Sequence, residues 1–314
     1  MFSIIIPTFN RAEVLELTLE AYFHQTCPEL IREIIIIDDG STDDTRSRIR
    51  RISERSPIKL IYLFQQNKGP AEARNRGIHI ASADILLITG DDIVPHPDMI
   101  KEHFIGHESH EFNTNICVLG YTAWPKDMKV TPFMRYIQEM GLQFGYSVIP
   151  DASNVPFNFF YTSNVSLHRT FLLEDELFDT DFPYAAWEDI ELAYRLTNRG
   201  LKIIYNSRAL GYHYHSISYI SFRKRQEKCG YSAYIFYRKH PELKDFLGID
   251  ASRTQSPLSK AIIDMMDKFC FFADRCSIES PPAFYDKAMS KYYNEGIIKA
   301  RRKYNEALKE RKPD

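Results

Sequence analysis

The sequence lacks three features: an excess of charge of either sign, long apolar runs and the pattern of a signal peptide at its first residues. Its 314 residues include 40 Lys and Arg against 42 Asp and Glu, whereas a protein that binds nucleic acid usually carries a basic excess. The longest aliphatic stretches, such as Ile34 to Ile37, are far shorter than the ~20 residues of a membrane-spanning helix. The N-terminus enters a strand-like segment without the basic, apolar and cleavage-site pattern of a signal peptide. We therefore expect no nucleic-acid partner and no membrane span.

Cysteine is also scarce. The five cysteines are odd in number and no two have metal-binding spacing, so we expect buried free thiols in a reducing cytoplasm. What the sequence does hold is an ordinary globular composition, with 44% apolar and 26% charged residues. That apolar content is enough to offset the entropy lost on ordering most of the chain. At about 150 residues per domain, the length predicts two domains or one large one.

The first 95 residues alternate strand and helix patterns. Short apolar runs predict strands, and apolar residues at helical spacing or N-cap residues predict the helices between them. The expected strands cover residues 2–6, 34–37, 60–64 and 85–88, and the expected helices cover 12–24, 41–52 and 70–81. This order predicts an α/β fold with a Rossmann-like, doubly wound sheet that helices cover on both faces.

The pattern becomes less regular after Pro97. We expect helices at 99–107, 132–140 and 190–199, and strands at 118–119, 160–167, 201–205 and 209–214. From Ser218 onward the sequence is mostly helical, with a last helix over about 283–308. We therefore expect one domain over residues 1–217 and a helical C-terminal region over residues 218–314.

Polar and charged residues follow each of the first four predicted strands. These segments are Thr8 to Arg11, Asp38 to Ser41, Asn67 to Pro70 and Thr89 to Asp92. Each one alone could be a helix cap or a turn. Because ligands of open α/β sheets bind beyond the carboxyl ends of the strands, the four together favour a site.

The chemistry of these residues suits a nucleoside diphosphate. A carboxylate such as Asp39 can accept hydrogen bonds from a base or a ribose, and one such as Asp91 can bind a hard divalent cation. Arg74 offers a planar fork for a phosphate or for an acidic neighbour. The sequence has neither a GxGxxG nor a GxxxxGK[ST] motif, so neither a dinucleotide site of the Rossmann type nor a P-loop is supported.

At this point the sequence resembles the family 2 inverting glycosyltransferases, which have the GT-A fold. The resemblance is carried by an ordered set of motifs that spans residues 2 to about 220. In order, they are the SIIIPTFNR segment from Ser3, EIIIIDDGSTD from Glu33, NKG from Asn67, ARNRG from Ala73, TGDD from Thr89, SNVSL from Ser163, FD from Phe178 and WEDIELAYRL from Trp187.

The resemblance implies a donor site in residues 1–95 and an acceptor site in residues 96–217. It assigns Asp39 to the uracil or ribose, Arg74 to the diphosphate or base, and Asp91 to a Mn²⁺ or Mg²⁺ ion as the last acid of the family's DxD motif. The first acid of that motif is replaced here by Thr89. The complete set of expected donor-site residues is Pro7, Thr8, Asn10, Arg11, Asp39, Asn67, Gly69, Arg74, Gly90 and Asp91.

The acidic pair Glu188 and Asp189 is the expected catalytic feature. By resemblance, Asp189 is the base that removes the proton from the acceptor hydroxyl, which an inverting displacement requires. Glu188 and Trp187 are expected to shape the acceptor site. The simpler interpretation is that the two acids only favour the start of the helix that follows them, and both interpretations can hold together.

Two histidines, His213 and His215, alternate along a predicted strand and so are expected on one face of it. The family often has a histidine here that approaches the metal or the diphosphate, and we expect at least one of this pair to do so. A structural histidine is the alternative.

The reaction implied is metal-dependent transfer of a sugar from a UDP-linked donor to a glycan, a lipid-linked acceptor or a polysaccharide precursor. A sugar-phosphate nucleotidyltransferase and a non-catalytic glycan-binding protein with a degenerate transferase fold remain as alternatives. The helices past Ser218 combine basic and aromatic residues. They predict either a solvated surface or a weak peripheral contact with the inner face of the cell membrane.

Overall fold

The computed structural model describes residues 1–251 and 256–310. Residues 252–255 and 311–314 of the predicted helical region lie outside the described part. The chain divides into two compact units. The first unit comprises residues 1–128, 144–180 and 188–215, and the second comprises residues 129–143, 181–187 and 216–314.

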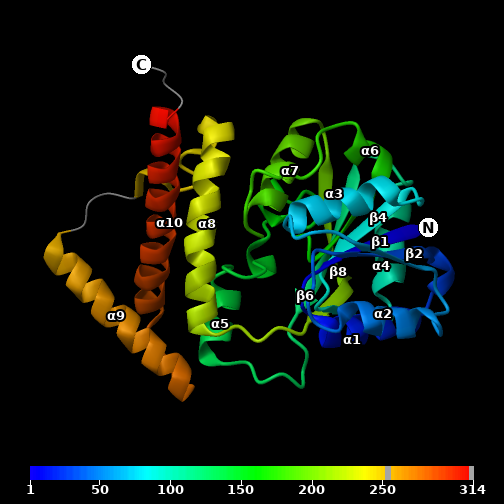
Figure 1. Ribbon diagram of the computed structural model, residues 1–314, viewed down its shortest axis with the longest axis horizontal. Coiled ribbons are helices and arrows are strands. Elements are labelled where there is room, and N and C mark those ends of the chain that lie inside the picture. The colour runs from blue at the N-terminus through cyan, green and yellow to red at the C-terminus, as the bar shows by residue number, and fades with distance from the viewer. Residues whose placement is uncertain (252–255, 311–314) are drawn as a thin grey trace. The chain divides into compact units, whose positions relative to one another are not determined.

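The first unit is built on a mixed sheet with helices packed against it (Figure 1). The sheet has eight strands in the order β3-β2-β1-β4-β7-β6-β8-β5. The neighbours β3, β2, β1 and β4 are parallel, and β7 is antiparallel to both β4 and β6. The strands are β1 Phe2–Thr8, β2 Ile31–Asp38, β3 Leu60–Phe64, β4 Ile85–Thr89, β5 Ile93–Pro95, β6 Ile116–Ala123, β7 Asn164–His168 and β8 Lys202–His213.

The four isoleucines of β2 show why this sheet needs helices on both faces. Ile35 and Ile37 belong to one core cluster and Ile34 and Ile36 to the other, and all four are fully buried. Successive side chains of a strand point to opposite faces, so an unbroken apolar run fits a strand that is covered on both sides. The prediction from the sequence is confirmed.

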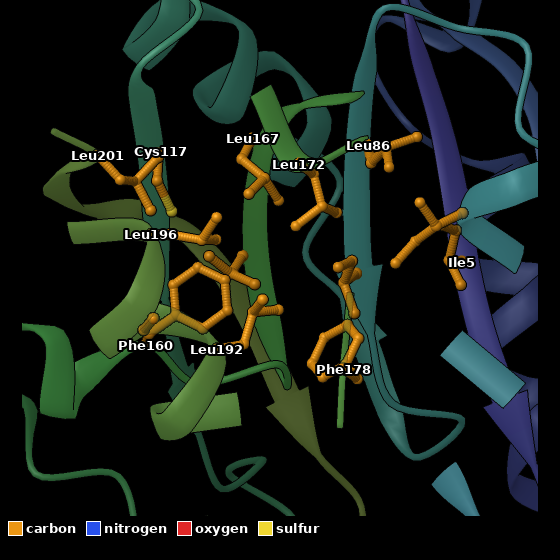
Figure 2. Packing of buried hydrophobic residues seen from close by; sticks show 14 of the residues in the cluster. Ile5, Leu86, Cys117, Phe160, Leu167, Leu172, Phe178, Leu192, Leu196 and Leu201 are labelled. Carbon is orange, nitrogen blue, oxygen red and sulfur yellow. The ribbon is translucent and has the colours of Figure 1, made fainter. Parts of the chain in front are cut away.

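Two sets of helices provide the two cores. The first cluster contains buried residues of α3, α6 and α7 (Figure 2), and the second contains buried residues of α1, α2 and α4. Their bounds are α1 Ala12–Phe23, α2 Thr45–Ser53, α3 Pro70–Ile80, α4 Met99–Glu108, α6 Arg169–Leu173 and α7 Glu188–Asn198. Helix α3 lies close to β1, because a Cβ atom at Gly77 would come within 2.6 Å of the Ile5 side chain.

The sheet curls back on itself at the end of β4. Strands β4 and β5 are four places apart in the strand order, yet only Gly90, Asp91 and Asp92 separate them in sequence. In a flat sheet the two strands would lie about 19 Å apart, which exceeds the roughly 14 Å that four extended residues can span. The curl therefore returns the far edge of the sheet to the carboxyl end of β4.

Three sequence predictions for this unit were wrong in detail. The strand expected at 160–167 begins only at Asn164, because residues 157–159 form a 3-10 turn. The two strands expected at 201–205 and 209–214 are one strand, β8, whose pairing with β6 shifts register after Gly120. Strand β5 was not predicted, since three residues give no periodicity to detect.

The second unit is helical. It contains α5 Pro132–Glu139, α8 Tyr219–Lys239, α9 Pro257–Cys276 and α10 Pro282–Glu310, so the mostly helical region expected after Ser218 is confirmed. Helices α8 and α10 lie side by side (Figure 1). A Cβ atom at Gly230 would come within 1.8 Å of the Tyr293 carbonyl oxygen, so glycine permits this close approach. None of the described helices is both long enough and apolar enough to span a bilayer.

Candidate functional site

The turn after β4 places two carboxylates beside the end of β1. The Thr8 hydroxyl donates a hydrogen bond to Asp91 Oδ2 over 2.8 Å, and the Thr18 hydroxyl donates to the Asp91 carbonyl over 2.8 Å. Asp91 and Asp92 are both buried. Two adjacent buried acids are costly unless cations or hydrogen-bond donors compensate their charge.

Arg11 and His213 provide that compensation. The Arg11 guanidinium donates to the Asp92 carboxylate and lies 3.5 Å from Asp91 Oδ1. From the last residue of β8, His213 Nε2 lies 3.4 Å from Asp92 Oδ2. The other ring nitrogen of His213, Nδ1, is buried and has no hydrogen-bond partner among the described residues.

The two acids differ in electrostatic character. Burial and the charge of Asp92 raise the pKa of Asp91 to about 7, although Arg11 and the Thr8 hydroxyl oppose the shift. Burial alone would also raise the pKa of Asp92, but His213 and Arg11 stabilise its charge and hold that pKa below its usual range. Asp92 is therefore the permanently charged member of the pair.

Asp39 ties the end of β2 to the loop that precedes α3. Its Oδ1 accepts hydrogen bonds of 2.8 Å from the Gln65 side chain and from the Lys68 backbone N–H, and its Oδ2 accepts one of 2.9 Å from the Gly69 N–H. Three of the roughly four lone-pair positions of the carboxylate are thus used within the protein. The fourth position has no hydrogen-bond partner among the described residues.

The neighbouring loops are held by Asn10 and Gly40. Asn10 has a φ of 53°, and its side-chain oxygen accepts a hydrogen bond of 2.7 Å from the Thr42 N–H. Gly40 has a φ of 92°, and a Cβ atom there would come within 2.9 Å of the Asn67 nitrogen. The loops after β1, β2 and β3 therefore form one connected rim.

Arg74 of α3 forms a buried ion pair with Glu188 at the start of α7. The Arg74 Nη1 donates to Glu188 Oε1 over 2.8 Å, and the two side chains are 11% and 3% exposed. The guanidinium also lies over the Phe178 ring, 5.3 Å from its centroid. The second oxygen of Glu188 and the Nε of Arg74 are buried without a partner among the described residues.

Asp189 is only partly buried. Its Oδ1 accepts a hydrogen bond of 2.9 Å from the Ile190 N–H, which satisfies a free donor of the first turn of α7, and Thr162 donates to its Oδ2 over 3.4 Å. Burial raises the pKa of Asp189, while Arg74 opposes that shift. Burial and the charge of Asp189 likewise raise the pKa of Glu188.

A short series of contacts joins the two acidic pairs. Thr89 ends β4 and pairs in the sheet with Asn164, the first residue of β7. The Thr89 hydroxyl donates to the Ser163 carbonyl over 2.9 Å, and the preceding residue, Thr162, is the partner of Asp189. The Asp91–Asp92 pair and Asp189 therefore lie at the same edge of the sheet.

The other residues predicted for the site are Pro7, Gly90, His215 and Trp187. Pro7 lies within β1 and Gly90 begins the turn that carries the acids. His215 lies beyond the end of β8 rather than on the strand, with its ring 5.6 Å from that of His213. Trp187 belongs to the helical unit, where it packs against Phe236 and Phe246.

Sequence reasoning missed three contributors: Asp92, Gln65 and Thr162. Asp92 stands next to the expected ligand Asp91, so its signal was present in the TGDD motif. Gln65 and Thr162 lie in loops without a periodic pattern, and only the folded structure reveals their contacts. Thr89, which replaces the first acid of the expected DxD motif, is fully buried.

The described residues contain no group of three or more His, Cys, Asp or Glu side chains arranged to hold a metal ion. Asp92 and His213 nevertheless form a carboxylate–imidazole pair, with Asp91 beside it. A Mg²⁺ or Mn²⁺ site of this kind commonly has one or two protein ligands, and phosphate oxygens of the substrate complete it. These residues therefore fit an ion that binds together with a diphosphate.

Known proteins resemble this chain in sequence. The family model described as "Glycosyl transferase family 2" matches residues 3–160. Validoxylamine A glucosyltransferase of Streptomyces hygroscopicus subsp. jinggangensis is 29% identical, over 77% of this chain and 62% of that protein. The chain thus spans less than two thirds of the length of this relative.

Two solved structures resemble the chain over most of its length. A mannosyltransferase from Pyrobaculum calidifontis in complex with GDP-Man and Mn²⁺ has a TM-score of 0.63 at 19% identity, over 95% of this chain and 86% of that one. S. aureus TarS 1-349 in complex with UDP has a TM-score of 0.55 at 16% identity, over 96% of this chain and 91% of that one. The chain has the GT-A fold expected from its sequence.

Proposed function

The chain belongs to glycosyl transferase family 2, and we propose that it transfers a sugar from a nucleoside-diphosphate donor to an acceptor hydroxyl with inversion at the anomeric carbon. The proposal is supported most strongly by one observation: two separate acidic pairs, from the ends of β4 and the start of α7, lie at one edge of the sheet. One pair is compensated by the Arg11 guanidinium and the His213 ring. The other holds a partly buried acid with a raised pKa.

The donor would bind on the rim formed by the loops after β1, β2 and β3. Thr8, Asn10, Asp39 and Gly69 stand there, and the free lone-pair position of Asp39 suits a ribose hydroxyl or a base N–H. We propose UDP as the carrier. One structural neighbour binds GDP-Man and another binds UDP, and the ligand screen described below distinguishes the two bases.

Asp92 and His213, together with Asp91, are the proposed ligands of a divalent cation, and His215 stands next to them. A bound Mg²⁺ or Mn²⁺ would supply positive charge for the leaving diphosphate. In the structure Arg11 lies against both acids and partly neutralises them. Arg11 would then turn to a phosphate oxygen when the acids take a new partner, because a guanidinium suits either anion.

Asp189 is the proposed base. Its carboxylate would accept the proton of the acceptor hydroxyl while that oxygen forms a bond to the anomeric carbon and the bond to the diphosphate breaks. A raised pKa makes a carboxylate a stronger base once it is ionised. Glu188, paired with Arg74, would position this acid, and acceptor contacts from Glu188 and Trp187 stay predictions. The acceptor is proposed to be a glycan, a lipid-linked sugar or a polysaccharide precursor.

A ligand screen tests the proposal. The thermal midpoint of the purified chain is measured with UDP, GDP, TDP and CDP, each with Mn²⁺ or with EDTA. A ligand at 100 times its Kd stabilises the native state by about 2.7 kcal/mol, so one nucleotide is expected to raise the midpoint, and EDTA should reduce that rise. If no nucleoside diphosphate raises the thermal midpoint, the assignment of the donor site is wrong. Release of pyrophosphate from a nucleoside triphosphate and a sugar phosphate would instead identify a nucleotidyltransferase.

A further inference from the structure

Helix α9 has two mainly apolar faces, and the described residues cover only one of them. The covered face packs within the helical unit through Ile263, Asp267, Cys270 and Ala273, all of them buried. The other face is an apolar stripe of Leu258, Ile262, Met265, Phe269 and Phe272, which are 72%, 42%, 63%, 39% and 55% exposed. Steps of four and three residues place these five side chains in one line along the helix.

This stripe is unusual for a surface helix. Scattered single apolar residues on a surface need no explanation, whereas a contiguous apolar patch marks a binding surface. From Leu258 to Phe272 the stripe extends about 21 Å along the helix axis. Phe271 lies next to it and is 37% exposed. The stripe is therefore large enough to bind a partner.

The acids of α9 lie mostly on its packed side. Asp267 is buried and accepts from the hydroxyl of Tyr219 over 2.6 Å, whereas Asp264 is 54% exposed and accepts from Lys291 over 2.8 Å. Asp274 accepts from a backbone N–H of α8.

The bases of the helix, in contrast, lie outside. Lys260, Lys268 and Arg275 are exposed, and none of them forms an ion pair with another described residue. The solvent side of α9 therefore combines the apolar stripe with three bases and one exposed acid, Asp264, which is paired with Lys291, so positive charge is in excess there.

We propose that this face of α9 binds an anionic lipid surface, with the helix lying in the plane of the membrane. The apolar stripe would enter the boundary between headgroups and acyl chains, and the three bases would contact the anionic headgroups. Long basic side chains suit this position because their stems stay on apolar surface while their charges reach the headgroups. The inference does not depend on the proposed catalytic function.

A second copy of the chain fits this face less well. The stripe follows the a and d positions of a heptad, and Lys268 and Arg275 then occupy g positions. An antiparallel pair of α9 helices would place these bases opposite each other, and a parallel pair would place Arg275 and Lys268 opposite no acidic residue. Homodimerisation through α9 therefore lacks charge complementarity, whereas an anionic surface provides it.

The helix proposed here for membrane contact differs from the helices expected from the sequence. That expectation rested on the basic and aromatic residues of α8 and α10, but most of the α8 cations have partners inside the unit. These are Arg223 over Tyr292, Arg225 with Gln143, Lys228 over Tyr184, Arg238 over Tyr304 and Lys239 with Asp181. Helix α9 was not among the helices expected to contact a membrane, but it carries the exposed apolar stripe and the exposed bases.

The test is co-sedimentation of the full chain with vesicles of phosphatidylcholine, with and without phosphatidylglycerol, at low salt. The wild type is expected to pellet only with the anionic vesicles and to be released by high salt. Replacing Lys260, Lys268 and Arg275 by Gln should weaken binding roughly 100-fold, at roughly fivefold for each base. The double variant Ile262→Ser with Met265→Ser should bind the anionic vesicles more weakly than the wild type at every salt concentration.

A matched control uses bases of the same helical unit that do not lie on α9. Lys287, Arg302 and Lys303 of α10 are exposed, and their replacement by Gln removes the same charge. Equal loss of binding in both triple variants would show unspecific charge attraction and overturn the α9 assignment. Absence of pelleting by the wild type would overturn the proposal, as would dimers in sedimentation equilibrium that the Ile262 and Met265 changes dissolve.

A spectroscopic measurement works even if a charge variant folds poorly. Met265→Trp places a reporter on the stripe, and Ile298→Trp places one at an exposed apolar position of α10. Anionic vesicles are expected to shift the emission of the first variant to shorter wavelength and to leave that of the second unchanged. An unchanged spectrum for Met265→Trp would contradict insertion of the stripe.

Discussion

The buried ion pair between Arg74 and Glu188 permits a stability prediction that needs no substrate. Replacing Arg74 by Met removes the guanidinium, keeps a side chain of similar length, and leaves Glu188 buried at 3% exposure without its partner. Breaking a buried pair on one side typically costs about 3–5 kcal/mol, since the remaining charge is uncompensated. At roughly 2–4 °C per kcal/mol for a unit of this size, the thermal midpoint should fall by roughly 10 °C.

The pH dependence of this loss identifies its cause. The pKa of Glu188 is already raised above its ordinary value of 4.5 by burial and by Asp189, and Arg74 opposes that rise. Without Arg74 the folded-state pKa must rise further. An acid with a raised folded-state pKa binds more protons in the folded state, so it costs stability as pH increases and less as pH decreases. The loss in Arg74→Met should therefore be largest at about pH 8 and shrink toward about pH 5.

Urea unfolding followed by circular dichroism at the two pH values measures these free energies. The double variant Arg74→Met with Glu188→Leu is the control, because it removes both charges and should recover much of the stability. A loss below about 1 kcal/mol in Arg74→Met would mean that water compensates Glu188. A loss that does not change with pH would mean that packing against Phe178, rather than charge, is what the substitution removes.

Asp189→Asn should reduce the rate of transfer about 10²–10⁴-fold with little change in the calorimetric Kd for the nucleoside diphosphate. Glu188→Gln should act mainly on the KM for the acceptor. Near-native turnover in Asp189→Asn together with an inactive Glu188→Gln would assign the base to Glu188 instead. His213→Ala and Asp92→Asn should each weaken the Mn²⁺-dependent part of nucleotide affinity, measured by calorimetry with Mn²⁺ or EDTA, and equal affinity with and without metal in the wild type would contradict the metal site. Burial lowers the pKa of His103 from 6.5 to about 4, so the unfolded state binds its proton first and stability should decrease by about 3 kcal/mol as pH falls through that interval. Urea unfolding of His103→Gln should show a weaker decrease, and an unchanged one would refute this origin.

The sequence predicted those parts of the fold in which local pattern and tertiary burial agree. The isoleucines of β2 and the helix that begins at Pro70 are such cases, because each element has a periodicity or a cap that fixes it. It could not predict β5, which exists only because residues 93–95 pair with β8. The exposure of the α9 stripe was not predictable either, because the stripe has the same apolar spacing as a buried face and differs only in what covers it.

The candidate site was predictable to a similar extent. Residues that follow predicted strands, such as Thr8, Asp39 and Asp91, were found because a parallel sheet gathers the carboxyl ends of its strands at one edge. The ion pair between Arg74 and Glu188 was not predictable, because the two residues are 114 positions apart in the sequence and no spacing rule links them.

The curl of the sheet has a consequence for the order in which the protein is made. The turn with Asp91 and Asp92 leaves the ribosome early, but the strand that supplies His213 and pairs with β5 is synthesised more than a hundred residues later. At about 5–20 residues per second, the two acids wait on the order of ten seconds before that strand can fold against them. A nascent chain that has not reached residue 213 therefore has the two acids but not the histidine beside them, so the proposed metal site can form only once this sheet is nearly complete.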